Sequence, residues 1–326
     1  MDEFSKNKLM ETEQTILSTL PSYKTHLVSI TSSLGTEEHI WTVSLNTESP
    51  NTPMVMLHGF AAGIGFWCLN MEYLSRNRPV YAIDILGFGR SSRPNFSRDS
   101  LEAEKQMIDA LEAWRIEMKL EKIIFLGHSM GAYLSTLYAI SYPDPVEHLV
   151  LADPWGFSDK YENPPMILKI LAFLLQWLNP IGVIRYLGPY WGPLLLQKTR
   201  RDIFGGFCSI LEDEILPRYF YYCNASSNNT GERAFYSMVA GIGWAKIPIV
   251  KRIHKLKSNI PMTFIFGSKT WMDKEMATRI KAMRPHSSVD MKIVDDAGHH
   301  IYSEQAEQFN EIVETTCNER ETKKFK

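Results

Sequence analysis

The amino-acid sequence predicts an α/β fold, with a mostly parallel central sheet, helices on both faces of the sheet and an inserted helical cap. Short apolar runs alternate along the chain with stretches of helical periodicity, which is typical of a parallel sheet covered on both sides. The interval between the apolar runs at residues 148–152 and 262–266 is too long for a simple crossover, so an insertion is expected there. A chain of 326 residues can hold one large domain and such a cap.

Strands are expected where apolar and β-branched residues lie between turn residues. These runs are residues 39–45, 53–57, 80–85, 122–126, 148–152, 262–266 and 289–294. The stretch over residues 101–118 illustrates the helices between them. Ser100 is its expected N-cap, and Met107, Leu111 and Trp114 lie on one face at helical spacing.

The same pattern divides the chain into segments. We expect an N-terminal extension over residues 1–24, a core over residues 25–157 and 256–318, a cap over residues 158–255 and a tail over residues 319–326. The first half of the cap is rich in Leu, Ile, Trp and Tyr, but polar residues interrupt it too often for a membrane span. It is expected to pack over the core as a cap helix, to bind lipid as a lid or interfacial surface, or to do both.

A nucleophile is predicted at the end of the fourth expected strand. Residues 127–131 read Gly-His-Ser-Met-Gly and lie between an apolar run and a helical stretch. In this context the pentapeptide is typical of a nucleophile elbow, a sharp strand-to-helix turn that projects the hydroxyl of Ser129 out of the sheet. A glycine-rich loop with an incidental serine is the alternative.

A serine hydroxyl needs a base within hydrogen-bond reach and an acid that orients the base. His299 follows the last expected strand and is the preferred base, with His300 as the alternative. Asp273, in the loop after residues 262–266, is the preferred acid. Asp153, directly after residues 148–152, is the alternative acid. The order Ser129, Asp273, His299 is that of the α/β-hydrolases and differs from those of chymotrypsin and subtilisin.

Attack on an acyl carbon also needs two N–H donors for the negative charge that develops on its oxygen. By analogy with the fold, the backbone amides of Phe60 and Met130 are expected to form this oxyanion hole. A flexible loop over residues 61–65 is the alternative for the segment that follows Phe60.

Composition excludes several classes of function. The formal net charge is −2 and basic residues form no long run, so no nucleic-acid partner is expected. The 4 cysteines are scattered without metal-binding spacing, so we expect neither a metal nor a disulfide framework, and the proposed chemistry requires no cofactor. Charged residues interrupt the first 20 positions, so the protein is expected to be cytoplasmic rather than secreted.

Five segments together resemble a specific group of proteins. The sequence is similar to the animal α/β-hydrolase-domain proteins of groups four and five over about residues 13–315. The segments that carry the resemblance are Leu-His-Gly-Phe at residues 57–60, the run at residues 84–94, the elbow at residues 127–131, Asp-Pro-Trp-Gly-Phe at residues 153–157 and Gly-His-His-Ile-Tyr at residues 298–302. We expect Trp155 and Phe157, within the fourth segment, to contact the substrate.

The resemblance implies a function in lipid metabolism. One branch of the group consists of serine lysophospholipases and N-acylphosphatidylethanolamine lipases, and the other of co-activators of a triglyceride lipase at lipid droplets. Vertebrate co-activators carry asparagine at the position of Ser129, so the serine favours a carboxylic ester hydrolase. The alternatives are lysophosphatidic acid acyltransfer, for which the expected His-x4-Asp motif ends here in Glu304, and a non-enzymatic co-activator.

The expected partners follow from the same resemblance. They are a phospholipid or lysophospholipid substrate, a membrane or lipid-droplet surface, and a triglyceride lipase. The first 40 residues lack the Trp-rich segment of droplet-associated relatives, so the protein is expected to be cytoplasmic and peripheral to these surfaces rather than stably anchored.

Overall fold

The α/β fold that the sequence predicts is confirmed. The computed structural model describes residues 3–33, 35–159, 179–225, 228–241 and 243–324. Within these residues, eight strands form one sheet in the order β1-β2-β4-β3-β5-β6-β9-β10, and a two-stranded ribbon, β7-β8, lies apart from it. The strands are β1 (Lys24–Thr31), β2 (Glu37–Leu45), β3 (Met54–Leu57), β4 (Val80–Ile83), β5 (Ile123–His128), β6 (Val146–Ala152), β7 (Val239–Ala240), β8 (Trp244–Ala245), β9 (Met262–Gly267) and β10 (Val289–Val294).

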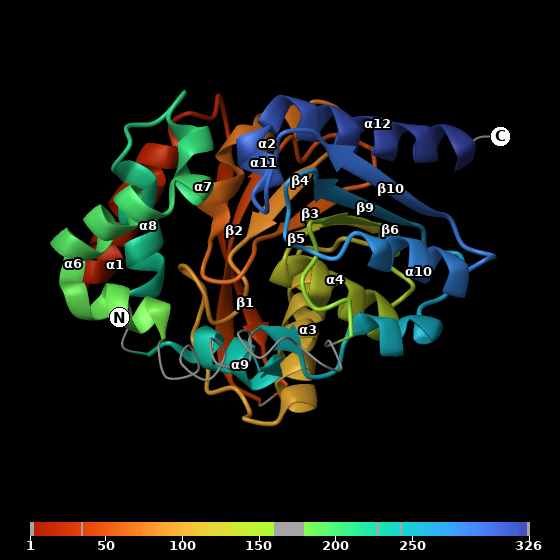
Figure 1. Cartoon of the computed structure of the whole chain (residues 1–326), viewed down its shortest axis with the longest axis horizontal. Coiled ribbons are helices and arrows are strands. Elements are labelled where there is room, and N and C mark those ends of the chain that lie inside the picture. Colours follow the sequence, from red (N-terminus) through yellow and green to blue (C-terminus); the bar gives the residue numbers. More distant parts are fainter. Residues whose placement is uncertain (1–2, 34, 160–178, 226–227, 242, 325–326) are drawn as a thin grey trace.

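Helices cover both faces of the sheet (Figure 1). Outside the segment between β6 and β9, the helices are α1 (Glu3–Leu17), α2 (Cys68–Leu74), α3 (Ser100–Glu117), α4 (Met130–Ser141), α10 (Glu275–Met283), α11 (Ile301–Glu304) and α12 (Ala306–Lys324). Among the described residues between β6 and β9, the helices are α6 (Pro180–Thr199), α7 (Arg201–Phe204), α8 (Ile215–Asn224) and α9 (Thr230–Met238). Short 3-10 segments are η1 (Ile64–Trp67), η2 (Gly205–Phe207), η3 (Ile249–Lys251) and η4 (Ile253–Lys255).

Strand β3 shows how the two halves of the core arise. All four of its side chains are buried, because helices pack on both sides of the sheet. Val55 and Leu57 join the cluster that includes apolar residues of α3, α4 and α10, whereas Met54 and Met56 join the cluster on the other face with α1, α2 and α12. A fully buried strand therefore reads as a continuous apolar run in the sequence.

The strand register brings the carboxyl ends of several strands to one edge of the sheet. β3, β5, β6 and β9 are parallel, with Leu57 opposite Gly127, His128 opposite Ala152, and Ala152 opposite Ile265. The residues that follow these strands therefore gather at one edge, where ligands bind in open α/β sheets. This edge contains the turn at Ser129 and the loops after β3, β6 and β9.

The sequence analysis missed one strand, and its expected N-cap for α3 was wrong. The edge strand β1 was not predicted, because most of its side chains are exposed or half-buried and form no apolar run. The N-cap of α3 is Asp99, whose carboxylate accepts a hydrogen bond from the amide of Glu102 at 3.1 Å, while Ser100 is the first residue of the helix. Asp99 and Ser100 are adjacent, and both residue types are common at the N-cap position, so the sequence alone does not show which of them caps the helix.

The terminal helices pack against the body of the protein. α1, in the expected N-terminal extension, contacts α8 of the cap (Figure 1). Trp41 of β2 donates its indole N–H to Glu13 of α1 at 2.9 Å. At the other end, α12 continues to Lys324, through most of the expected tail. The apolar residues 165–178, expected to begin the cap, lie outside the described residues.

Candidate active site

The structure places Ser129 in a strained turn between β5 and α4. Its φ of 52° and ψ of −113° are unfavourable for a residue with a side chain. Close packing around the turn explains the flanking glycines, because a Cβ atom on Gly131 would lie 2.2 Å from the carbonyl oxygen of Leu57. The amide of Ser129 also donates to the carbonyl of Ala152 at 3.0 Å, which ties the turn to β6.

His299 is the histidine that contacts this serine. Its Nε2 lies 3.1 Å from Oγ of Ser129, within hydrogen-bond reach. His300 points elsewhere, with its Nδ1 3.4 Å from the hydroxyl of Tyr302. Burial lowers the pKa of His300 to about 3, so its ring is neutral at physiological pH. The geometry therefore offers His299, the preferred base, as the partner of Ser129.

The acidic partner of this histidine differs from the preferred residue. Asp153 lies directly after β6, is fully buried and accepts a hydrogen bond from Nδ1 of His299 at 2.5 Å. Thr270, in the loop after β9, donates its hydroxyl to the same carboxylate oxygen at 2.6 Å. These contacts fix the carboxylate against the ring and hold the proton on Nδ1, leaving Nε2 free to accept the serine proton.

The preference for Asp273 was therefore wrong. Its carboxylate accepts hydrogen bonds from the hydroxyl of Ser158 at 2.7 Å, from the Arg279 guanidinium at 2.6 Å and from the amide of Glu275 at 3.1 Å. The last contact satisfies an amide at the start of α10. Asp273 lies six positions beyond the end of β9 and serves local structure there, whereas Asp153 leaves a strand adjacent to β5 and reaches the histidine directly.

Residues that the sequence analysis missed hold this arrangement in place. His128 donates from Nε2 to the carbonyl oxygen of His299 at 3.0 Å, and burial lowers its pKa well below the ordinary value. Glu304 accepts from the amides of Gly298 and His300, at 2.8 and 3.1 Å, on either side of His299. A charged acceptor gives stronger hydrogen bonds than a neutral one, so Glu304 fixes the histidine loop.

A buried histidine, His58, holds the loop after β3 in place through two hydrogen bonds. Nδ1 of His58 donates to the carbonyl of Gly59 at 2.7 Å, and Nε2 accepts from the amide of Ile85 at 3.0 Å. Burial lowers the pKa of His58 to about 4, which keeps the ring neutral. Its position directly after a buried strand is the sequence signal for such a structural role.

The two expected oxyanion donors come from two segments that adjoin the serine. Phe60 belongs to the turn after β3, and Met130 is the first residue of α4. A Cβ atom on Gly59 would lie 3.3 Å from Cβ of Ser129, so the β3 turn approaches the elbow closely. Helix N-termini carry free amides and a positive dipole end, and both favour a developing negative charge at this point.

An apolar pocket of about 630 Å³ opens beside Ser129. Trp155, expected to contact the substrate, lines this pocket and donates its indole N–H to the carbonyl of Gly243. Phe157 does not, because its side chain is buried in the core against Phe264, with ring centroids 5.6 Å apart. The expectation that Phe157 binds substrate was therefore wrong.

The cap supplies much of the pocket wall. Apolar side chains from the cap and from the loops after β3 and β9 include Phe60, Ile181, Val183, Ile184, Leu195, Leu196, Ile203, Phe220, Phe235, Trp271 and Met272. Polar groups line it near the triad and at Tyr236, Thr199 and Arg200. Such a wall suits an alkyl chain, with few positions for a charged group. Among the described residues, no cluster of three or more His, Cys, Asp or Glu side chains is arranged to hold a metal ion.

Comparison with known proteins identifies the family of the chain. Residues 52–306 match the family model described as alpha/beta hydrolase fold. The chain is 43% identical over 293 residues to a (lyso)-N-acylphosphatidylethanolamine lipase from Homo sapiens, covering 88% of this chain and 85% of that one. It is 40% identical over 322 residues to a 1-acylglycerol-3-phosphate O-acyltransferase from Mus musculus, covering 96% and 90%.

Solved structures show the same fold. A carboxylesterase from Bacillus subtilis superposes with a TM-score of 0.67 at 16% identity, covering 95% of this chain and 96% of that one. The sequence relatives confirm the resemblance that the five segments indicated. The chain belongs to the α/β-hydrolase family, among the animal α/β-hydrolase-domain proteins of groups four and five.

Proposed function

We propose that the protein hydrolyses fatty-acyl esters of phospholipids and lysophospholipids, with N-acylphosphatidylethanolamine and its lyso form as the first substrates to test. The main support is the hydrogen-bonded chain from Ser129 through His299 to Asp153 beside an apolar pocket. The name of the human relative, a (lyso)-N-acylphosphatidylethanolamine lipase, supports the lipid class.

The proposed reaction proceeds in two steps. His299 accepts the proton of Ser129 as its Oγ attacks the ester carbonyl, and buried Asp153 stabilises the imidazolium that forms. The amides of Phe60 and Met130 hold the oxyanion. His299 then protonates the departing alcohol, which leaves an acyl group on Ser129. Water, deprotonated by the same imidazole, releases the fatty acid and restores the serine.

Arg200 is our candidate for contact with the substrate phosphate. It is the one lysine or arginine among the described residues that line the pocket. Its guanidinium pairs with Asp202 through two hydrogen bonds, at 3.0 and 2.8 Å, and about half of each side chain is exposed. A solvated pair of this kind is weak, so a phosphate can displace the carboxylate at low cost. Arg200→Gln should raise KM for phospholipids but not for neutral esters, and Arg201→Gln is the matched control.

We propose water rather than a lysolipid as the acyl acceptor. The carboxylate of Glu304, at the end of the His-x4-Glu stretch, accepts from two backbone amides and so has a structural use. Hydrolysis is also preferred over non-enzymatic co-activation of a triglyceride lipase, because Ser129 and His299 are in contact. Acyl transfer is tested by adding lysophosphatidic acid to the reaction and measuring whether phosphatidic acid forms.

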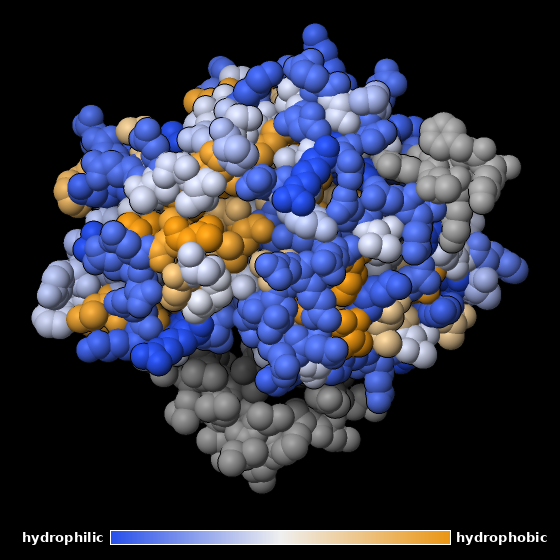
Figure 2. Space-filling model, turned by 90° about the horizontal axis from the view of Figure 1, so that it is seen from above, coloured by the Kyte–Doolittle hydropathy of each residue, from blue (hydrophilic) through white to orange (hydrophobic). Residues whose placement is uncertain are grey.

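We further propose that the protein acts at the cytoplasmic surface of membranes or lipid droplets. Tyr186, Tyr190 and Trp191 of α6 are 92%, 72% and 60% exposed, and aromatic side chains favour the lipid interface. Figure 2 shows apolar side chains gathered in patches on a mainly hydrophilic face. No helix in the described ranges is long and apolar enough to span a bilayer. Replacing Tyr190 and Trp191 together by alanine should reduce co-sedimentation with phospholipid vesicles.

Labelling with a fluorophosphonate tests the enzyme directly. The probe reacts only with an activated serine, so the wild-type protein should be labelled and Ser129→Ala should not. The same variant should fail to release fatty acid from N-acylphosphatidylethanolamine while its melting temperature stays close to wild type. Equal labelling of both proteins would refute the assignment of Ser129.

A further inference from the structure

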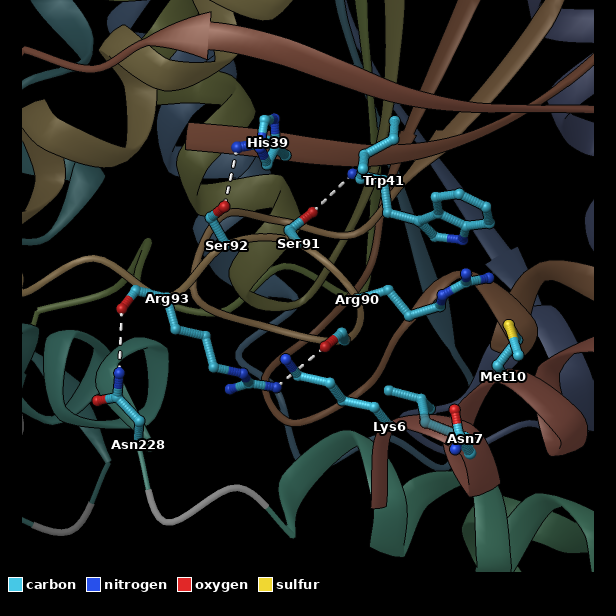
Figure 3. Close-up of a pocket in the computed structure, with 13 residues that line it drawn as sticks. Lys6, Asn7, Met10, His39, Trp41, Arg90, Ser91, Ser92, Arg93 and Asn228 are labelled. Atoms are coloured by element: carbon cyan, nitrogen blue, oxygen red, sulfur yellow. Dashed lines mark hydrogen bonds between the residues drawn. The ribbon is translucent and has the colours of Figure 1, made fainter. Parts of the chain in front are cut away.

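A second pocket, of about 500 Å³, lies between α1, the β1-β2 edge and the loop after β4. It shares no residue with the pocket beside Ser129. Figure 3 shows side chains from several segments converging on it. Its described lining contains no acidic residue and consists of Lys6, Asn7, Leu9, Met10, Leu27, His39, Trp41, Gly89, Arg90, Ser91, Ser92, Arg93 and Asn228.

Three cations line this pocket, and only one of them has an acidic partner. Arg90 pairs with the buried carboxylate of Glu13 at 2.7 Å and stacks on the ring of Trp41, with 3.6 Å between the guanidinium carbon and the ring centroid. Within the described part of the chain, Lys6 and Arg93 form no ion pair. Figure 3 shows their side chains extending toward one another across the pocket. The carboxylates of Asp84 and Glu232 act on Arg93 only from outside the pocket lining, so an anion in the pocket can contact both cations directly.

Arg93 is held rigidly for such a contact. Its guanidinium donates to the carbonyls of Gly87, Gly89 and Cys223, at 2.7, 3.0 and 2.9 Å. An arginine has five N–H groups, so these three bonds leave two for a ligand. Burial lowers the pKa of Arg93, and the nearby carboxylates of Asp84 and Glu232 oppose this shift without cancelling it. A bound anion would supply the remaining stabilisation.

Part of the pocket lining is apolar. Leu27 and Met10 are 57% and 44% exposed, and the buried Leu9 and Trp41 also line the pocket. Exposed apolar side chains next to a group of cations match a ligand with an alkyl chain joined to an anionic head. The hydroxyl of Ser92 accepts from the amide of His39 at 2.9 Å, which leaves its own hydrogen for a ligand oxygen.

We propose that this pocket binds the phosphate of a single-chain amphiphile, with the head between Lys6 and Arg93 and the chain along Met10, Leu27 and Trp41. The ligand is distinct from the substrate at Ser129, and its binding requires no catalysis. The phosphate can come from a free monomeric lipid or from a lipid in a membrane. The two sources offer the same chemistry to the pocket and are separated by the experiment.

The test measures binding of n-decyl phosphate to the full chain by isothermal titration calorimetry. This probe has no acyl ester, so Ser129 cannot consume it. Lys6→Gln removes a pocket charge, and Lys8→Gln removes a charge from the same helix, where Lys8 pairs with Glu11 and does not line the pocket. We expect Lys6→Gln to weaken binding about tenfold and Lys8→Gln to leave it unchanged.

Further arms of the experiment identify the source of the phosphate and the contribution of the alkyl chain to binding. Vesicles that contain phosphatidic acid replace the monomer in one arm, and inorganic phosphate replaces it in another. If Lys6→Gln weakens binding of the decyl phosphate monomer, the ligand is a free lipid. If Lys6→Gln weakens only the binding to vesicles, the ligand is a membrane lipid. Inorganic phosphate should bind much more weakly than decyl phosphate. Equal binding by the wild type and both variants, or equal binding of inorganic and decyl phosphate, would overturn the proposal.

Discussion

Replacing Asp153 by asparagine should nearly abolish catalysis, whereas the same change at Asp273 should not. The carboxylate of Asp153 lies 2.5 Å from Nδ1 of His299 and is fully buried. An asparagine that presents its amide N–H to Nδ1 favours the tautomer with the proton on Nε2, which cannot accept the serine proton. The equivalent change in a well-studied triad lowers kcat about 10⁴-fold, or about 5 kcal/mol of transition-state stabilisation.

The structure assigns a smaller effect to Asp273→Asn. Its ion pair with Arg279 joins side chains that are 33% and 50% exposed, so the pair is worth less than about 1 kcal/mol. The hydrogen bond to the amide of Glu275 survives, because the asparagine side-chain oxygen can still accept it. We expect a melting temperature lower by about 2 °C or less and kcat within about twofold of wild type.

The assay compares kcat for a soluble fluorogenic acyl ester and the rate of fluorophosphonate labelling in the two variants. Thermal unfolding monitored by circular dichroism serves as the control, because Asp153 is buried and also accepts from Thr270. Loss of activity in a folded Asp273→Asn protein, with activity retained in Asp153→Asn, would refute the assignment of the acid.

Three further predictions concern the support of the site and its response to pH. Thr270→Val removes the second hydrogen bond to Asp153 and should lower kcat about tenfold with KM unchanged, as measured by steady-state kinetics. Glu304→Gln replaces an acceptor that serves two amides, so labelling of Ser129 should slow about tenfold without loss of fold. Burial lowers the pKa of His148 to about 3, so the unfolded chain binds its proton first as pH falls below 6.5. At pH 4.5 the neutral, buried His148 should therefore lower the free energy of unfolding by about 3 kcal/mol relative to neutral pH. In urea titrations, His148→Gln should lose less stability than the wild type between pH 7 and pH 4.5.

Sequence reasoning located most of the fold because its strands are buried on both faces. Strands such as β3 and β9 appear as continuous apolar runs, and the register then places their ends together. The elbow was visible because glycines flank Ser129, and the structure shows that a side chain at Gly131 would overlap the main chain of Leu57. The edge strand β1 lacked any such signal, because most of its side chains are exposed or half-buried and need not be apolar.

The details of the site depended on contacts that no local pattern records. His128 and Glu304 act on His299 from far along the chain or across a turn, and their partners are main-chain groups that any residue possesses. Phe157 follows a strand in the same way as Trp155, yet the two side chains point to the core and to the pocket respectively. The backbone after Asp153, itself at a φ of 43°, determines which ring lines the pocket.

The choice between two aspartates shows why strand order matters more than loop position. β6 and β9 are adjacent and parallel, so the loops after both strands reach the same side of His299. Asp153 needs no loop, because it leaves β6 at the level of the elbow, and its buried carboxylate fills the position beside Nδ1. The β9 loop still contributes, but through the hydroxyl of Thr270, which donates to that carboxylate. A second carboxylate at the same place would repel the first. Once Asp153 occupies that place, the neighbouring loop serves better with a neutral donor, and the carboxylate of Asp273 accepts from the amide of Glu275, the first residue of α10.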